Sequence, residues 1–192
     1  REVGLEGLGI AERSYQQAVA YAQERAQGRA VGAPKTEVSP IIEHPDVRRM
    51  LMTMKAYNEA SRGLLYDTAA AGERAHRHPD DAGRQAAAHR VALLTPVAKA
   101  WCSDLGVAMT SIGIQVHGGM GYVEEAGAAQ HYRDARITPI YEVTNGIQAI
   151  DLVMQTAQQE AAAPLHGGVD SGGCRESGTH LELIWRGPEG RR

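Results

Sequence analysis

The chain has 192 residues, of which 43% are hydrophobic and 22% are charged, and this balance is ordinary for a single globular domain. Its formal net charge of −3 gives no reason to expect nucleic acid or an acidic membrane as a partner, and no apolar run approaches the ~20 residues of a membrane span. The two cysteines, Cys102 and Cys174, imply no disulfide framework and indicate a reducing compartment, for which we expect the cytoplasm.

Two long helices are expected in the first half of the chain. Apolar residues recur at helical spacing over residues 3–27, and Gly28 is a plausible helix stop. Residues 29–43 contain two prolines and are expected to form a loop. A second helix begins with Pro45 at its first position and Asp46 in its first turn, where a carboxylate suits the helix dipole. Its apolar stripe has the near-heptad spacing of a bundle member and comprises Val47, Met50, Leu51, Met54, Tyr57, Leu64, Leu65 and Thr68.

Three more helices are expected in the second half. The longest spans about residues 84–116, with Pro96 inside it as an expected bend. Its apolar residues are Leu93, Leu94, Val97, Trp101, Leu105, Met109, Ile112 and Ile114. After an HGGMG turn, a short helix fits residues 124–133, and a last helix fits residues 145–159, with Ile147, Ile150, Leu152 and Val153 as its buried face. The predicted fold is all-α, a four-helix-bundle-like domain over residues 1–162.

The end of the chain differs from the rest. Residues 163–192 are rich in glycine, serine and charge and have no helical period. Such a segment cannot bury enough apolar surface to offset the entropy of ordering it. We therefore expect a disordered or adventitious tail.

One spacing in the second helix is that of a metal motif. Glu73 and His76 have the Glu-x-x-His pattern of di-iron bundle proteins. Such sites need two of these motifs plus two further carboxylates, and the chain has no second copy. The sequence therefore predicts no metal site here, and a solvated polar cluster at a helix end is expected.

The stretch of residues 115–151 has a density of glycine and charge that plain helices do not need. Gly118, Gly119 and Gly121 lie close together, and glycines let main-chain amides approach a phosphate or a ring. They do not make the GxGxxG spacing, and no strand precedes them. The alternative is a tight turn between two helices.

This stretch resembles the C-terminal domain of the flavin-dependent acyl-CoA dehydrogenases. The matching pieces are QVHGGMGY at 115–122, RDARI at 133–137 and IYEVT at 140–144. Two further pieces match in the right order, at 7–29 and 44–69, so that the resemblance covers roughly residues 4–155. The sequences AQGR and TNGIQ resemble those of the larger branch of the family, which includes methylthiopropionyl-CoA dehydrogenases.

The resemblance implies that Glu142 is the base that removes a proton from the carbon alpha to the thioester. A carboxylate suits this task in a partly desolvated site, and Pro139, Ile140 and Tyr141 are apolar neighbours of that kind. From spacing alone, Glu142 would be a glutamate near the start of a helix, stabilised by the helix dipole. Val143 departs from the glycine usual in the family, and a β-branched residue resists positive φ, so the shape of the acyl pocket and the substrate class stay open.

The resemblance also implies FAD as the cofactor. Arg25 matches an arginine that reaches the flavin pyrophosphate across a dimer, and a guanidinium suits phosphate because its donors form a planar fork. Gln115 and Gly119 match contacts to the FAD of a neighbouring subunit, and Thr144 matches a threonine near the FAD phosphates or ribose. A cation at a helix end is the alternative for Arg25.

Two positions near these residues depart from the family pattern. The family has Phe-Gly after the arginine, where this chain has Gln27 and Gly28, so the packing around the adenine or flavin is altered or comes from another part of the protein. A second family glutamine that contacts FAD is replaced by Gly146, to which we assign no cofactor contact.

The function implied is α,β-dehydrogenation of an acyl-CoA thioester with FAD as hydride acceptor. The implied partners are the acyl-CoA substrate, an electron-transfer flavoprotein and sister subunits in a homo-oligomer. Family members are longer, with an N-terminal helical domain and a middle β domain before this region, so we expect the chain to be part of such a protein and to be inactive alone. The alternatives are a non-catalytic helical fragment or oligomerisation module, and a helical binding protein related by descent only.

Overall fold

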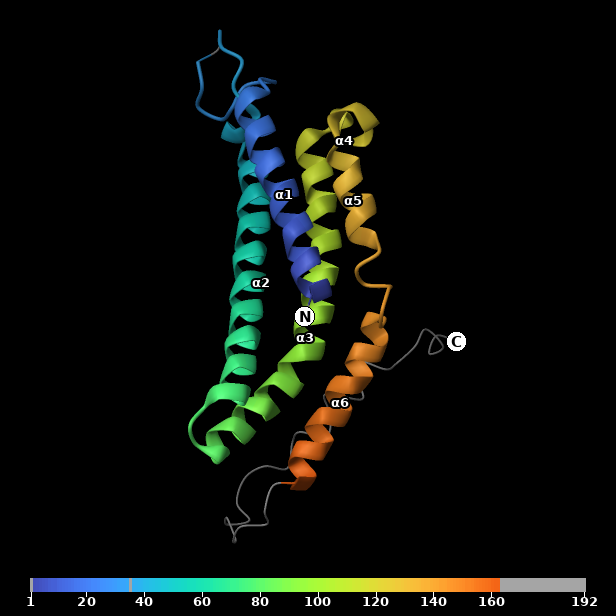
Figure 1. Cartoon of the computed structure of the whole chain (residues 1–192). Coiled ribbons are helices and arrows are strands. Elements are labelled where there is room, and N and C mark those ends of the chain that lie inside the picture. The colour runs from blue at the N-terminus through green and yellow to red at the C-terminus, as the bar shows by residue number, and fades with distance from the viewer. Residues whose placement is uncertain (1, 35, 163–192) are drawn as a thin grey trace, which may run out of the picture. The chain divides into compact units, whose positions relative to one another are not determined.

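The computed structural model describes residues 2–34 and 36–162 of the chain (Figure 1). Within these residues every regular element is a helix, apart from an isolated antiparallel bridge between Ala26 and Pro40. The all-α prediction is therefore confirmed. The predicted tail, residues 163–192, lies outside the described residues.

Three long helices make the body of the bundle: α1 (Glu2–Glu24), α2 (Pro45–Arg77) and α3 (Asp81–His117). Each packs against the other two, and a shorter helix, α5 (Ala128–Arg136), packs on α3 and α1. In Figure 1, α3 runs between α2 and α5. By length and composition α3 would also suit a membrane span, and its contacts with α1, α2, α4 and α5 give its apolar side a place within the bundle.

The core consists of two clusters of buried side chains. One is centred on Met54 and Met109, which are 0% and 3% exposed, and it joins α1, α2 and α3. The other joins Leu8 and Leu65 to Ala98 and Cys102 further along α3. Burial raises the pKa of the Cys102 thiol, which keeps it protonated as a small core residue.

Helices α1 and α3 approach so closely because their contact consists of glycines and small residues. A Cβ added to Gly7 would lie 2.6 Å from the carbonyl oxygen of Cys102, and a Cβ added to Gly106 would lie 2.9 Å from the carbonyl oxygen of Gly7. Only hydrogen fits on either glycine at these separations. The small residues therefore fix how far α1 stands from the part of α3 that carries Lys99, Ser103 and Asp104.

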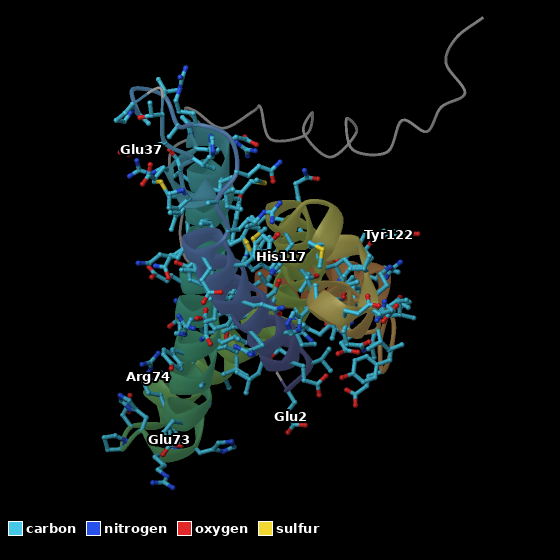
Figure 2. All side chains as sticks on the ribbon, turned by 90° about the horizontal axis from the view of Figure 1, so that it is seen from above. Glu2, Glu37, Glu73, Arg74, His117 and Tyr122 are labelled. Carbon is cyan, nitrogen blue, oxygen red and sulfur yellow. The ribbon has the colours of Figure 1, made fainter. Side chains whose placement is uncertain are left out.

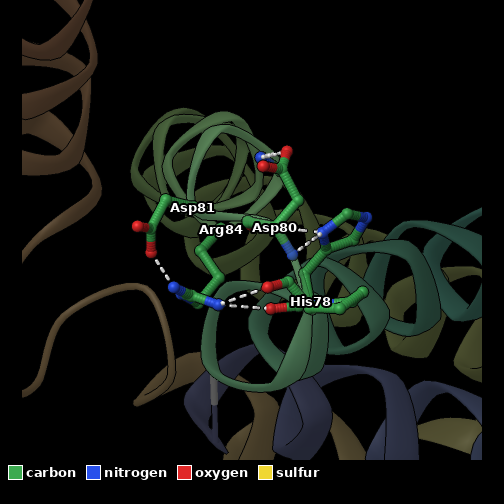
Figure 3. Close-up of polar contacts among 6 residues, drawn as sticks. His78, Asp80, Asp81 and Arg84 are labelled. Atoms are coloured by element: carbon green, nitrogen blue, oxygen red, sulfur yellow. Dashed lines mark hydrogen bonds and ion pairs between the residues drawn. The ribbon is translucent and has the colours of Figure 1, made fainter.

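A polar turn joins α2 to α3 (Figure 3). Asp80 caps α3, because its carboxylate accepts a hydrogen bond of 2.9 Å from the amide of Gly83. The Arg84 guanidinium reaches back to the carbonyl of His78 at 2.6 Å and pairs with Asp81. These contacts give partners to backbone groups at the end of α2 and at the start of α3.

The pair Glu73 and His76 lies just before this turn, at the end of α2. Glu73 forms an ion pair with Arg77 at 2.9 Å, and Figure 2 shows Glu73 beside Arg74 at the far end of α2 from Glu37. Among the described residues, no three His, Cys, Asp or Glu side chains gather as a metal site.

The predicted helix boundaries are mostly close. The second helix starts at Pro45 as predicted. The first ends at Glu24, three residues before the predicted end, because residues 26–28 instead pair with the loop; the amide of Gln27 donates to the carbonyl of Ser39 at 3.0 Å. The loop contains one 3₁₀ turn, η1 (Ile41–Glu43).

The region after α3 is more broken than predicted. Gly118, at φ 60°, ends α3, and a single helical turn, α4 (Gly119–Tyr122), follows. The single helix predicted for residues 124–133 is wrong, because Gly127 at φ 73° separates a 3₁₀ turn, η2 (Glu124–Ala126), from α5. A left-handed residue cannot continue a right-handed helix.

The buried face of α3 also differs from the predicted one. Trp101, expected in the core, is 45% exposed, whereas Ala98, Cys102 and Gly106 are buried. The close α1–α3 contact selects small residues, and the larger ones flank it. Helix α3 continues through Pro96, and in Figure 1 its first turns run at an angle to the rest, as expected where a proline removes a helical hydrogen bond.

The last helix, α6 (Asn145–Ala162), forms where it was predicted, but its predicted buried face is wrong. Ile147, Ile150 and Val153 are 52%, 60% and 61% exposed. Of the four residues expected in that face, only Leu152 is half-buried. Helical spacing made this side of α6 apolar, and nothing within the described residues covers it.

Candidate active site

The predicted base, Glu142, lies in the connection between α5 and α6. The amide of Val143 donates to the carbonyl of Tyr141 at 2.8 Å, which closes a three-residue turn with Glu142 at its tip. Glu142 has φ 58°, and among the described residues it is the single non-glycine residue with positive φ. Its side chain is exposed. Left-handed backbone is costly for a residue with a Cβ, and such strain is concentrated at functional sites.

The backbone at Val143 does not have the positive φ that a β-branched residue resists. Val143 is absent from the positive-φ residues, so its branched side chain meets no conformational conflict. The unusual backbone falls one residue earlier, on Glu142 itself. The substitution of valine for the family glycine therefore changes the surface beside the carboxylate, where Val143 is 39% exposed, without straining the turn.

We expect the backbone strain at Glu142 to lower the free energy of unfolding by a measurable amount. Glu142→Gly and Glu142→Ala both remove the carboxylate, but only glycine adopts positive φ freely. The glycine variant should therefore exceed the alanine variant by about 1 kcal/mol in free energy of unfolding. Chemical denaturation of the two variants measures this difference, and equal stabilities would mean that the turn does not hold Glu142 at positive φ in solution.

One side of the Glu142 turn is tethered to α1. The Tyr141 hydroxyl donates a hydrogen bond to the Glu6 carboxylate. This bond raises the pKa of Tyr141 to about 12, with the carboxylate charge acting in the same direction, so the phenol keeps its proton. Glu6 precedes Gly7, so the tether starts where α1 lies closest to α3.

The other side of the turn is tethered to α3 through Asn145, the first residue of α6. The Asn145 side-chain oxygen accepts a hydrogen bond from the Lys99 amine at 2.8 Å. Its amide nitrogen donates to Asp104 at 2.7 Å, to Ser103 at 3.0 Å and to the carbonyl of Ala100 at 3.2 Å. The glutamate turn is therefore held between two fixed helices.

A cavity of about 590 Å³ opens beside this anchor, between α3, α5 and the residues that follow α5. Its lining includes the predicted cofactor residue Thr144, together with Ser111, Arg136 and Ile140. The guanidinium of Arg136 and the hydroxyls of Ser111 and Thr144 give it groups suited to a phosphate or a sugar. Sequence reasoning had not singled out Arg136, although it lies in the RDARI run.

A second pocket, of about 380 Å³, brings together two other predicted cofactor residues, Arg25 and Gln115. Arg25 follows the end of α1, Gln115 lies in the last turn of α3, and Gly118 completes the wall. No atom lies within 4 Å of a Cβ built on Gly118 or on the adjacent Gly119, so this stretch of backbone is open to approach. An exposed guanidinium beside open main-chain amides fits a phosphate group.

His117 is a buried residue in the lining of this second pocket. It is 5% exposed, its Nδ1 lies 2.7 Å from the carbonyl oxygen of Gly113, and its ring stacks on Tyr21 at 4.4 Å between centroids. Figure 2 shows His117 within the bundle and Tyr122, which is 84% exposed, pointing away from it. The histidine of the glycine motif therefore packs the end of α3.

Gln27, which replaces the family phenylalanine, also belongs to this second pocket. Its side-chain oxygen accepts a hydrogen bond from Arg25 at 3.3 Å, and His44 Nε2 lies 2.8 Å from its carbonyl oxygen. A polar residue thus orients the guanidinium where the family has an aromatic ring.

The predicted cofactor residues therefore divide into two groups. Arg25 and Gln115 share one pocket, which Gly119 adjoins, whereas Thr144 lines the other, near Glu142. The two pockets have no lining residue in common: the lining of one includes Gln115 and Gly118, just before α4, and the lining of the other includes Asn145 and Gly146, at the start of α6. Figure 1 shows α4 and α6 in different parts of the fold. One copy of this chain does not gather all of these residues around a single ligand.

Comparison with known proteins identifies the family. Residues 2–157 match the family described as "Acyl-CoA dehydrogenase, C-terminal domain". The chain therefore belongs to the acyl-CoA dehydrogenase family, of which it carries the C-terminal helical domain. The resemblance on which Glu142 and the cofactor residues were assigned is confirmed at the level of the family.

Three relatives indicate how the chain relates to whole proteins. It is 48% identical over 151 residues to the 3-methylmercaptopropionyl-CoA dehydrogenase of Ruegeria pomeroyi, covering 79% of this chain and 26% of that protein. It is 36% identical to a butyryl-CoA dehydrogenase of Syntrophomonas wolfei, and the match covers 77% of this chain and 24% of that protein. The solved structure of butyryl-CoA dehydrogenase from Megasphaera elsdenii superposes with a TM-score of 0.65 at 30% identity. The superposition covers 81% of this chain and 35% of that one. The chain thus spans about a quarter of the length of the first two relatives.

Proposed function

We propose that this chain is the base-bearing domain of an FAD-dependent acyl-CoA dehydrogenase and that Glu142 is its catalytic base. The observation that carries the proposal is the Glu142 turn. A carboxylate is held at φ 58° and tethered on both sides, through Tyr141 to Glu6 and through Asn145 to Lys99. An exposed glutamate without a function needs none of this support. We assign the domain to residues 1–162.

In the proposed reaction, bound FAD would supply the acceptor for the hydride that leaves the β carbon of the thioester. Glu142 accepts the α proton of the thioester, and the tethers hold its carboxylate where the proton leaves. Thr144 and its pocket would hold part of the FAD bound to the same subunit.

The second pocket would serve a neighbouring subunit. Arg25 offers its guanidinium to the pyrophosphate, and Gln115 and the backbone at Gly119 offer further donors. Because the two groups of cofactor residues lie in separate pockets, this assignment requires a homo-oligomer. The exposed residues Ile147, Ile150 and Val153 supply apolar surface for contact with other domains or subunits.

The substrate proposed is an acyl-CoA thioester. The relatives' names specify 3-methylmercaptopropionyl-CoA in one and butyryl-CoA in another, so a short acyl chain fits both. We propose an electron-transfer flavoprotein as the electron acceptor and the cytoplasm as the location. The acceptor follows from the family resemblance, and the location follows from the reducing compartment that the two cysteines indicate.

The alternative is a non-catalytic helical fragment or oligomerisation module. The exposed apolar side of α6 favours self-association whether or not the chain is catalytic. The alternative gives no role to the positive φ at Glu142 or to its two tethers.

Flavin binding separates these two proposals. The full-length protein that carries this domain should purify with FAD and should lose the visible absorbance of its oxidised flavin when an acyl-CoA is added without an electron acceptor. The 192-residue chain alone should bind FAD weakly or not at all, because it holds only part of each site. Stoichiometric FAD that stays with the isolated chain through gel filtration would contradict the incomplete sites, and a full-length protein without FAD would contradict the dehydrogenase.

A further inference from the structure

Lys99 is a buried lysine in the middle of α3. It is 5% exposed, and within the described residues no carboxylate lies within ion-pair distance of its amine. Burying an ammonium group is costly unless it is hydrogen-bonded and faces negative charge. A leucine or methionine would fill this position in the bundle at lower cost, so packing alone does not account for the amine.

The Lys99 amine is directed at the residue that starts α6. Its Nζ donates to the side-chain oxygen of Asn145 at 2.8 Å, across 46 residues of sequence. Ser103 strengthens this link, because its hydroxyl lies 3.3 Å from the same oxygen and 3.0 Å from the Asn145 nitrogen. With Asp104 on its nitrogen, Asn145 has partners on both ends of its amide group and one fixed orientation.

Asn145 in turn fixes the backbone that carries Glu142. The backbone amide of Asn145 donates to the backbone carbonyl of Pro139 at 3.2 Å. The segment between these two residues therefore closes into a loop that carries Glu142. Burial lowers the pKa of Lys99, and the nearby carboxylates of Asp104 and Glu142 oppose that shift. The charge on Lys99 is therefore attracted by Glu142 itself as well as by Asp104.

We propose that Lys99 is the positioning residue of the catalytic base, because its buried amine holds Asn145 and thereby sets the place of the Glu142 carboxylate. This inference rests on the proposed dehydrogenase function and adds a residue to it. Lys99 touches neither substrate nor cofactor in this role. It acts through Asn145, whose side-chain oxygen its amine contacts at 2.8 Å.

The test compares three variants of the full-length, FAD-loaded protein. Lys99→Met keeps the length and the apolar stem but removes the amine. Asn145→Ala removes the other end of the link from an otherwise exposed helix, so it does not depend on the folding of the bundle around position 99. Lys55→Met is the matched control, since Lys55 lies on the surface of α2 with a side chain that is 59% exposed.

Lys99→Met and Asn145→Ala should each slow the limiting rate of flavin reduction by about 10–100-fold, because a base displaced by about 1 Å loses that much in rate. The acyl-CoA concentration for half-saturation should stay unchanged, since the base is not a binding group. Amide hydrogen exchange should become faster at residues 142–148 in both variants. Lys55→Met should match the parent in all three measurements.

Two results would overturn the proposal. If Lys99→Met reduced its flavin at the parent rate, or lost rate without faster exchange at residues 142–148, Lys99 would not position the base. If the parent protein failed to reduce its flavin with any acyl-CoA, the proposed function would fail, and the role of Lys99 would fail with it.

Discussion

Replacing Glu142 by glutamine should nearly stop the reduction of the flavin by acyl-CoA in the complete enzyme. Glutamine keeps the size of the side chain and much of its hydrogen bonding but cannot accept the α proton. Loss of a positioned general base usually costs ~10²–10⁴-fold in rate. Acyl-CoA should still bind and still perturb the flavin spectrum, because the carboxylate is needed for proton removal rather than for affinity. Stopped-flow measurement of flavin absorbance separates the two effects.

Glu125→Gln is the control for this experiment. Glu125 is an exposed glutamate in the short turn η2, and the same change of charge there should leave the rate at the parent value. A Glu142→Gln enzyme that reduced its flavin at the parent rate would show that the base lies elsewhere. The tethers through Tyr141 and Asn145 would then serve the fold alone.

The helices of the bundle were largely predictable because their causes are local. Pro45 at a helix start and the stripe that includes Met50, Leu51 and Met54 are signals within one segment, and the structure buries all three of these apolar residues at 6% exposure or less. The face of α3 was not predictable in the same way. Its large residue Trp101 is displaced from the core by contacts between small residues on two helices, and one helix alone does not reveal such a contact.

Helix α6 shows the limit of periodicity more directly. The spacing of Ile147, Ile150 and Val153 correctly indicated an apolar side of a helix. It gave no information about what covers that side, and the described residues leave all three at least half exposed. An apolar stripe predicts burial only where the covering element is part of the same chain.

The candidate active site could be proposed from the family resemblance and only in part from the residues themselves. The family motif pointed to Glu142, and the cofactor residues Arg25 and Gln115 do share a pocket. The support of Glu142 could not be read from the sequence, because Tyr141–Glu6 and Lys99–Asn145 join positions 135 and 46 residues apart. Lys99 lies in an apolar run, where the pattern offers no sign of its partner.

The close contact between α1 and α3 should make Gly7 among the least replaceable residues of the bundle. In Gly7→Ala, the new methyl group would lie 2.6 Å from the carbonyl oxygen of Cys102 and 3.0 Å from the Cα of Ser103. Both are backbone atoms of a long helix, so the helices must move apart. Overpacking of this kind costs about 1–3 kcal/mol, which corresponds to a fall of roughly 2–12 °C in the thermal midpoint of a domain of this size.

Gly9→Ala provides a matched comparison two residues further along α1. A Cβ at Gly9 meets no atom within 4 Å, so alanine there should raise stability by about 0.5–1 kcal/mol through its better helix propensity. Thermal unfolding followed by circular dichroism should therefore separate the two variants in opposite directions, and equal midpoints would contradict the close contact. Gly7→Ala should also slow flavin reduction in the complete enzyme. Gly7 lies between Glu6, which holds Tyr141, and Ser103, which holds Asn145, so moving α1 from α3 strains both tethers of Glu142.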